Sequence, residues 1–107
     1  MNITNYKNIA VNPNPHGIDA RKIYSKVDAQ VMHLTLKPGE GLLTHKTPVD
    51  VFFYVLEGTG IVEIGDEREE VEKDSIIASP ANIPHSLKNE SDSIVRFLVV
   101  KTPNPSK

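Results

Sequence analysis

The chain has 107 residues, 38% hydrophobic and 24% charged, which suits one folded domain and excludes a disordered chain. Its 12 Lys and Arg nearly balance 14 Asp and Glu, so the basic block typical of a nucleic-acid-binding protein is missing. The longest uncharged apolar run, Val51 to Leu56, is far shorter than the ~20 residues of a membrane helix, and the lack of cysteine excludes disulfides and thiolate chemistry.

Short strands separated by Gly and Pro account for most of the chain. Residues 1–17 are expected to form an arm with one short strand at Lys7–Val11, and residues 103–107 a tail. Between them, the segments are rich in β-branched residues and none has a helical period. The predicted strands are Asp19–Ser25, Gln30–Leu36, Val49–Leu56, Ile61–Ile64, Glu67–Val71, Ser75–Ala78, His85–Asn89 and Ile94–Lys101. This spacing predicts an all-β sandwich or small barrel over residues 18–102.

Two turns and one strand constrain the arrangement further. Gly65-Asp66 predicts a two-residue hairpin with a positive φ at the glycine. Pro38-Gly39 predicts a type II turn. Val49–Leu56 is apolar on both faces, so we expect the barrel interior to cover one face and a second sheet or a partner subunit to cover the other.

Two histidines, His45 and His85, are the candidate metal ligands. His45 precedes the most hydrophobic strand, and His85 follows Pro84 and opens another strand. Two imidazoles delivered by turn-to-strand junctions can meet inside a closed barrel and bind a divalent first-row ion. The alternative is that both are hydrogen-bonded pocket histidines without a metal. His16 lies in the arm and is expected to be exposed.

Two segments of the chain, PGEGLLTHKTPVDVFFYVLEGTG and KDSIIASPANIPHSLKN, surround the two histidines. The first resembles the motif G-x5-H-x-H-x3,4-E-x6-G, and the second resembles G-x5-P-x-G-x2-H-x3-N, which are the two motifs of the cupin family. The motifs and the strands between them cover Pro38 to Asn89, about half of the chain. The resemblance implies a double-stranded β-helix, the cupin or jelly-roll barrel, with one small pocket. It also implies a divalent metal site that usually uses three His and one Glu.

Only part of the metal motif is present. His45 and His85 take the first and last histidine positions, but Thr47 stands at the second, and Val51 (Phe52 with the longer spacer) stands at the glutamate position. Without the carboxylate, nothing offsets the charge of a cation in a low-dielectric pocket. Two neutral imidazoles favour weak binding of Zn²⁺, Ni²⁺ or Cu²⁺ over Mn²⁺ or Fe²⁺.

The remaining motif positions are mostly occupied as the family pattern requires. Gly39 and Gly58 take the glycines of the first motif, and Asn89 takes the asparagine of the second, whereas Lys73 replaces its opening glycine. The second motif is one residue longer than usual, which predicts a β-bulge near Ser79-Pro80.

Two residues are candidates for a third ligand. Asp50 is adjacent to Val51, and it reaches the pocket only if the strand begins after it or bulges there, as Pro48 would permit. His33 has the opposite parity to Met32, Leu34 and Leu36. It faces the pocket if those three side chains face the sheet packing.

These observations predict a small stand-alone cupin that binds a small molecule. Its hydrophobic pocket would include Val51, Phe53 and Val55, with His45 and His85 holding a divalent ion weakly at the polar end. One alternative is a metal-dependent oxygenase, isomerase or decarboxylase acting on a small polar metabolite, which needs a third ligand. Another is a non-catalytic sensor or structural module. Whether the protein is an enzyme stays open, and no catalytic residue or organic cofactor is assigned.

The expected partner is a second copy of the chain. An edge strand from the arm would extend the partner's sheet and make a homodimer. Neither a nucleic acid nor a membrane is expected as a partner. The first ten residues contain no apolar signal-peptide core and the chain has no cysteine, so a cytoplasmic location is expected.

Overall fold

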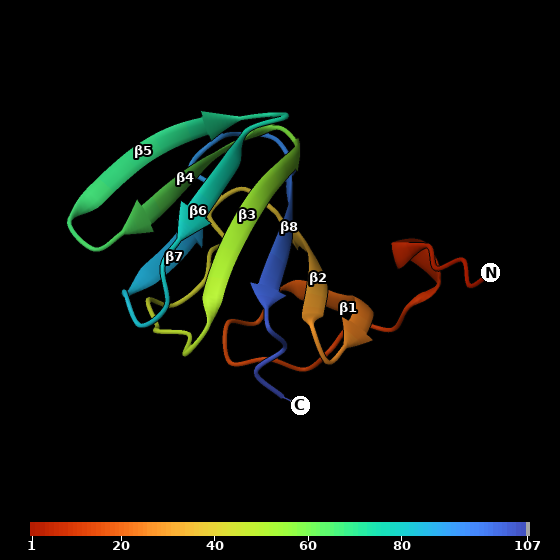
Figure 1. Cartoon of the computed structure of the whole chain (residues 1–107). Helices are drawn as coiled ribbons and strands as arrows, with labels where there is room; N and C mark the ends of the chain where they lie inside the picture. The colour runs from red at the N-terminus through yellow and green to blue at the C-terminus, as the bar shows by residue number, and fades with distance from the viewer. Residues whose placement is uncertain (107) are drawn as a thin grey trace.

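The computed structural model describes residues 1–106 and consists almost entirely of antiparallel strands (Figure 1). A short 3-10 helix, η1 (Tyr6–Asn8), precedes β1 (Asp19–Lys26), β2 (Ala29–Leu36), β3 (Asp50–Glu57), β4 (Thr59–Ile64), β5 (Glu67–Glu72), β6 (Ile76–Ser79), β7 (His85–Lys88) and β8 (Val95–Thr102). All eight predicted strands are present, with ends displaced by at most two residues. No helix among the described residues is long and apolar enough to span a bilayer. The cytoplasmic location stays a prediction.

The strands form two sheets that pack around one core. One sheet has five strands in the order β1-β2-β8-β3-β6, and the other has three in the order β5-β4-β7 (Figure 1). Along β8, Val95, Phe97 and Val99 are buried, while the residues between them face the other side of the sheet. The predicted inward positions of β3, Val51 and Phe53, are buried too. This alternation is the period of two that a half-buried strand requires.

Both predicted turns are confirmed. Gly65 lies between β4 and β5 with φ +57°, the positive value expected of a two-residue hairpin. Gly39 has φ +87°, and the Glu40 N–H donates to the Lys37 carbonyl oxygen at 3.0 Å, as in a type II turn. The side chain of Asn89 fixes the loop beside this turn, because its Nδ2 donates to the carbonyl oxygen of Leu36 at 2.9 Å.

The ends of the chain differ from expectation. The strand expected at Lys7–Val11 is absent from the described residues, and η1 begins there instead because the Asn5 side chain accepts a hydrogen bond from the Lys7 N–H at 3.0 Å. In the segment expected to be a tail, Asn104 is buried. Its N–H donates to the carbonyl oxygen of Val27 at 3.2 Å, which attaches this segment to the β1–β2 turn.

The bulge expected near Ser79-Pro80 is wrong. β3 and β6 pair without a register shift up to Ser79, and the extra residue is accommodated in the turn that follows. In that turn Asn82 has φ +64°, and its N–H donates to the carbonyl oxygen of Thr47 at 2.8 Å. Register shifts occur instead within β1 and near the end of β3. Asn tolerates this left-handed conformation, so the chain absorbs the insertion without disturbing the sheet.

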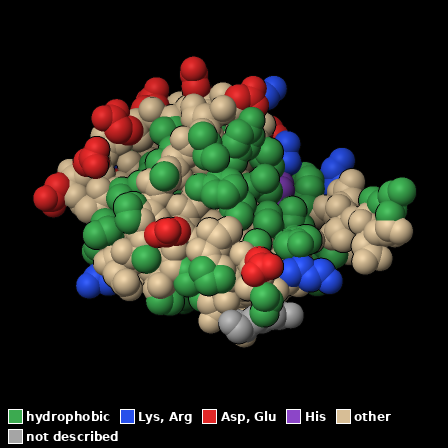
Figure 2. Space-filling view, in the orientation of Figure 1, with side chains coloured by type: hydrophobic (Ala, Val, Ile, Leu, Met, Phe, Trp, Pro, Cys, Tyr) green, Lys and Arg blue, Asp and Glu red, His purple; other side chains and the backbone are tan. Residues whose placement is uncertain are grey.

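The outer face of the five-stranded sheet is apolar over β3, β6 and β8. The strand register places six apolar side chains on this face: Phe52, Tyr54, Ile76, Ala78, Leu98 and Val100. We call this set the outer patch. Figure 2 shows it as a continuous hydrophobic surface, with acidic side chains gathered on the side of β5 and Lys and Arg side chains on the opposite side. No second sheet covers the patch among residues 1–106.

Candidate functional site

A cavity of about 170 Å³ lies between the inner faces of the strands. Most of its wall is apolar: Ile18, Ala20, Met32, Leu34, Leu42, Phe53 and Val99. Of the predicted apolar pocket residues, only Phe53 lines this cavity, whereas Val51 and Val55 are buried in the core instead. Its polar lining is a small set from the arm, the loop before β3, the start of β7 and β8: Asn14, His16, His45, His85 and Lys101. A mostly apolar concave site with a few convergent polar groups is the usual form of a small-molecule site.

His45 and His85 meet at this cavity. The two residues form an isolated antiparallel bridge, in which the His45 N–H donates to the His85 carbonyl oxygen at 3.1 Å and the reverse bond is 2.9 Å. Their ring centroids are 4.7 Å apart and the rings are nearly perpendicular, at 84°. The His85 ring also packs edge-on against Phe53, with centroids 5.3 Å apart. Backbone pairing of two segments forty residues apart therefore brings both imidazoles to one point.

The hydrogen bonds of His45 decide which of its nitrogens is available. Nδ1 lies 2.9 Å from the carbonyl oxygen of Leu43. A carbonyl oxygen only accepts, so Nδ1 carries the proton and Nε2 presents its lone pair. A ring N–H held by a backbone carbonyl is also what fixes the tautomer of metal-binding histidines.

His85 is buried, and hydroxyl groups surround it. Its Nδ1 lies 2.8 Å from Ser79 Oγ and its Nε2 lies 3.3 Å from Thr47 Oγ1. Hydroxyls donate or accept, so the tautomer with the proton on Nδ1 and the lone pair on Nε2 is allowed. Burial, followed by the charges of the nearby His45 and Lys101, lowers the pKa of His85 to about 4. The ring is neutral at pH 7, as a metal ligand or hydrogen-bond acceptor must be.

His16 was expected to be exposed, but the structure places it at the cavity. Its ring centroid is 5.4 Å from that of His45. The Asn14 side chain folds the arm back, because its Oδ1 accepts from the N–H groups of His16 and Ile18 at 3.1 and 3.3 Å. The Leu43 N–H donates to His16 Nδ1 at 2.8 Å, so Nε2 carries the proton in the neutral ring. His16 therefore offers the cavity a donor, not a lone pair.

Neither candidate for a third ligand joins the pair. Asp50 is exposed, and its Oδ1 accepts from the Ala81 N–H at 2.9 Å. The apolar residues of β2 take the interior, so His33 lies on the outer face, where its ring stacks on Tyr6 with centroids 3.8 Å apart and Arg96 donates to its Nε2 at 3.0 Å. Among residues 1–106, no three His, Cys, Asp or Glu side chains are placed to hold a metal ion together.

Lys101 is a second polar cavity residue that the sequence analysis missed. It continues the inward parity of Val95, Phe97 and Val99 to the end of β8, so its side chain lies on the interior side of the sheet. Burial lowers its pKa, and the neighbouring Lys22 lowers it further. The predicted strand Ile94–Lys101 already includes this residue, and following the alternation of Val95, Phe97 and Val99 to its end would have found it.

Comparison with known proteins assigns the family. The sequence model described as "Cupin domain" matches residues 32–101, which is more than half of the chain. The chain belongs to the cupin family. The TT1209 protein of Thermus thermophilus has a similar structure, with 29% sequence identity, a TM-score of 0.83, and coverage of 96% of this cupin and 98% of that protein.

Other relatives agree on the fold. This cupin is 26% identical to the MJ0764 protein of Methanocaldococcus jannaschii over 87 residues, which cover 80% of this chain and 75% of that protein. The crystal structure of MJ0764, described as a double-stranded β-helix cupin, has a TM-score of 0.78 and covers 92% of this chain and 91% of that one. A predicted oxalate decarboxylase of Thermotoga maritima has a TM-score of 0.84 at 18% identity, with 95% and 99% coverage. The predicted double-stranded β-helix is confirmed.

The cupin family usually holds a divalent metal, and the donors of this cupin fit only a reduced site. The tautomer of His45 and the allowed tautomer of His85 both direct the Nδ1 proton to the protein, which leaves the Nε2 lone pair of His45 available and that of His85 facing the Thr47 hydroxyl at 3.3 Å. Thr47, at the second histidine position, contacts His85 with a neutral hydroxyl. Val51, at the glutamate position, is buried in the core. The set suits a weakly bound ion that accepts imidazole nitrogen.

Proposed function

We propose that this cupin binds one small molecule in the cavity, with His45 and His85 at the polar end of the site. The convergence of these two rings on an apolar cavity is the observation that carries the proposal. Burial of the apolar part of a ligand against this wall contributes about 25 cal/mol of binding free energy per Å² of apolar surface removed from water. At about 170 Å³, the cavity has room for roughly ten water-sized groups, so the ligand is compact.

Filling the cavity is expected to abolish ligand binding. Val99 lines the cavity and Leu98 faces the opposite side of β8, so Val99→Phe occupies the site and Leu98→Phe is its matched control. A fragment library would be screened by amide chemical shifts, with unfolding curves to verify both variants. We expect shifts around the cavity in the wild type and in Leu98→Phe, and none in Val99→Phe. Fragments that bind Val99→Phe equally well, or shift only residues elsewhere, would reject the proposal.

We also propose that the histidine pair holds Zn²⁺, Ni²⁺ or Cu²⁺ weakly through its two Nε2 atoms. The held Nδ1 atoms support this assignment, because they orient both rings. The binding is weak because no carboxylate balances the cation and Lys101 lines the same cavity. When bound, the ion would supply a Lewis acid that polarises an oxygen of the ligand.

Zinc titration of the metal-free protein tests the pair directly. We expect the Nε2 signals of His45 and His85 to shift by NMR as one equivalent of Zn²⁺ is added, while the rings of His16 and His33 act as controls in the same sample. His16 already holds its proton on Nε2, and His33 lies on the outer face. His45→Ala and His85→Ala should each weaken Zn²⁺ binding at least about tenfold. Unchanged affinity in both variants would contradict the proposed site.

The enzyme alternative has less support from the residues. A metal-dependent oxygenase, isomerase or decarboxylase was predicted to need a third protein ligand, and neither Asp50 nor His33 joins the pair. The similarity to a predicted oxalate decarboxylase, at 18% identity, concerns the fold. No residue is therefore assigned a catalytic role. A non-catalytic sensor is compatible with the proposed binding.

We propose that a second copy of the chain covers the outer patch. The edge strand β6 contributes Ile76, which is 64% exposed. Acidic side chains gather beside β5 on one side of the patch and basic side chains on the other (Figure 2). A two-fold axis between these sides brings opposite charges together. This patch replaces the arm strand as the basis for the predicted homodimer.

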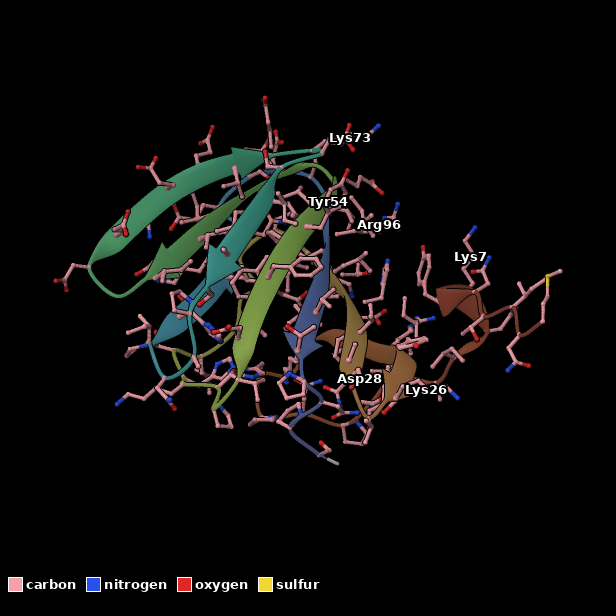
Figure 3. All side chains as sticks on the ribbon, in the orientation of Figure 1. Lys7, Lys26, Asp28, Tyr54, Lys73 and Arg96 are labelled. Carbon is pink, nitrogen blue, oxygen red and sulfur yellow. The ribbon has the colours of Figure 1, made fainter. Side chains whose placement is uncertain are left out.

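The homodimer predicts a solution mass of twice 11.9 kDa by light scattering. Ile76→Lys places a charge in the patch and should shift the protein to monomers. Val27→Lys is the matched control, because Val27 is 62% exposed but lies in the β1–β2 turn between Lys26 and Asp28, at the far end from Tyr54 (Figure 3). A monomeric wild type would reject the proposal, as would an Ile76→Lys dimer as stable as the control.

A further inference from the structure

We propose that the cavity ligand is a small carboxylate, whose apolar body lies against the wall and whose negative charge is held by the ammonium group of Lys101. This inference rests on the proposed function, because it names the ligand class of the same cavity. Three observations support it: Lys101 lies inside the barrel, no acidic side chain lines the cavity, and His16 carries an N–H donor there.

Lys101 is built into the interior of the fold. β8 is the central strand of the five-stranded sheet, and Lys101 pairs with Gln30 on β2 and Val51 on β3. Its side chain follows the inward parity of the strand and lines the cavity. His16 and His85 line the same cavity as Lys101.

Nothing in the cavity neutralises this charge. The cavity lining contains no Asp or Glu. Elsewhere in residues 1–106, some basic side chains have acidic partners: Lys88 lies 2.6 Å from Glu63, and Arg96 lies 2.7 Å from Glu57. Lys101 makes no such ion pair within the described residues. Burying an ammonium group without a partner costs free energy, which an anionic ligand would recover.

The remaining donors match a single carboxylate. His16 lines the cavity and carries its ring proton on Nε2, because its Nδ1 already accepts from the Leu43 N–H. Asn14 is not free, since its Nδ2 donates to the carbonyl oxygens of Asn12 and Ile18, each at 2.9 Å. One cationic side chain with one neutral donor suits a monoanion. A phosphate dianion would need more donors than the mostly apolar wall provides.

Shape-matched acid and amide pairs test the ligand class. The probes are butanoate, 4-methylpentanoate and benzoate, each with its amide, titrated by NMR into the full chain in EDTA so that no metal ion can favour the acids. We expect at least one acid to bind the wild type roughly tenfold or more tightly than its amide. Lys101→Met should remove this preference while leaving the amide affinity within about threefold. Lys22→Met, an exposed neighbour that does not line the cavity, should keep the preference.

The outcomes separate this inference from the proposed function. If amides bind the cavity as tightly as acids, or if Lys101→Met keeps the acid preference, the cavity still binds small molecules but the Lys101 assignment is overturned. If none of the six probes shifts a cavity residue while larger fragments do, the carboxylate inference falls alone. If no fragment of any kind binds the cavity, the proposed function falls with it.

Discussion

Gly58→Ala is expected to lower the free energy of unfolding by about 3–5 kcal/mol. Gly58 joins β3 to β4 with φ +79°, a conformation that costs alanine about 1–2 kcal/mol. A Cβ atom there would also lie 2.5 Å from the carbonyl oxygen of Ile94. That oxygen cannot move away without disturbing β8, because the strand begins at the next residue and Val95 is fully buried.

Gly39→Ala is the matched control for this prediction. Gly39 is the other motif glycine, with φ +87°, but a Cβ atom there would meet nothing within 4 Å. Its replacement should cost only the conformational penalty of about 1–2 kcal/mol. Urea unfolding of the two variants and the wild type would measure both losses. Equal losses would show that the contact with Ile94 contributes nothing.

Lowering the pH from 7 to 4.5 is expected to reduce the free energy of unfolding by about 2–3 kcal/mol through His85 alone. Burial, followed by the nearby charges of His45 and Lys101, lowers the pKa of folded His85 to about 4, against an ordinary value of 6.5. Above pH 6.5 both states are neutral and the stability is unaffected. Between pH 6.5 and 4, His85 is protonated in the unfolded chain but stays neutral in the folded protein, so the free energy of unfolding falls. Below pH 4 both states are charged and the loss levels off.

His85→Gln isolates this effect. The pKa values of His16 and His33 are also lowered, mainly by burial, but both residues are present in both proteins and cancel in the difference. Unfolding curves in EDTA between pH 4 and 8 should therefore diverge between wild type and variant only below pH 6.5. Glutamine keeps polar atoms near Ser79 and Thr47, which limits other losses. Parallel curves across the whole range would contradict the assignment.

Local patterns in the sequence were sufficient for much of the fold. Short segments rich in β-branched residues between Gly and Pro predicted the strands, because strand preference and turn chemistry depend on residues close together in the chain. Gly39 and Gly65 predicted their turns, because the required φ values depend on the residue itself. The bulge near Ser79 was predicted wrongly, because the sequence shows the extra residue but not whether strand or turn absorbs it.

The site was only partly predictable, because the sequence does not show how distant segments fold against one another. The motif spacing predicted that His45 and His85 would meet, and their backbone bridge brings them together. His16 was missed because its position depends on an Asn14 turn that folds the arm back. His33 was left open because parity alone does not say which face of β2 is inside.

The family, the strands, the histidine pair, and the loss of the carboxylate and one histidine from the metal motif all follow from the amino-acid sequence. The surroundings of that pair depend on the tertiary structure. It placed His16 and Lys101 at the same cavity and turned Asp50 away. Local conformation follows from neighbouring residues. The charge and donors of a cavity instead follow from side chains that meet across long stretches of chain, through pairings that no local pattern encodes.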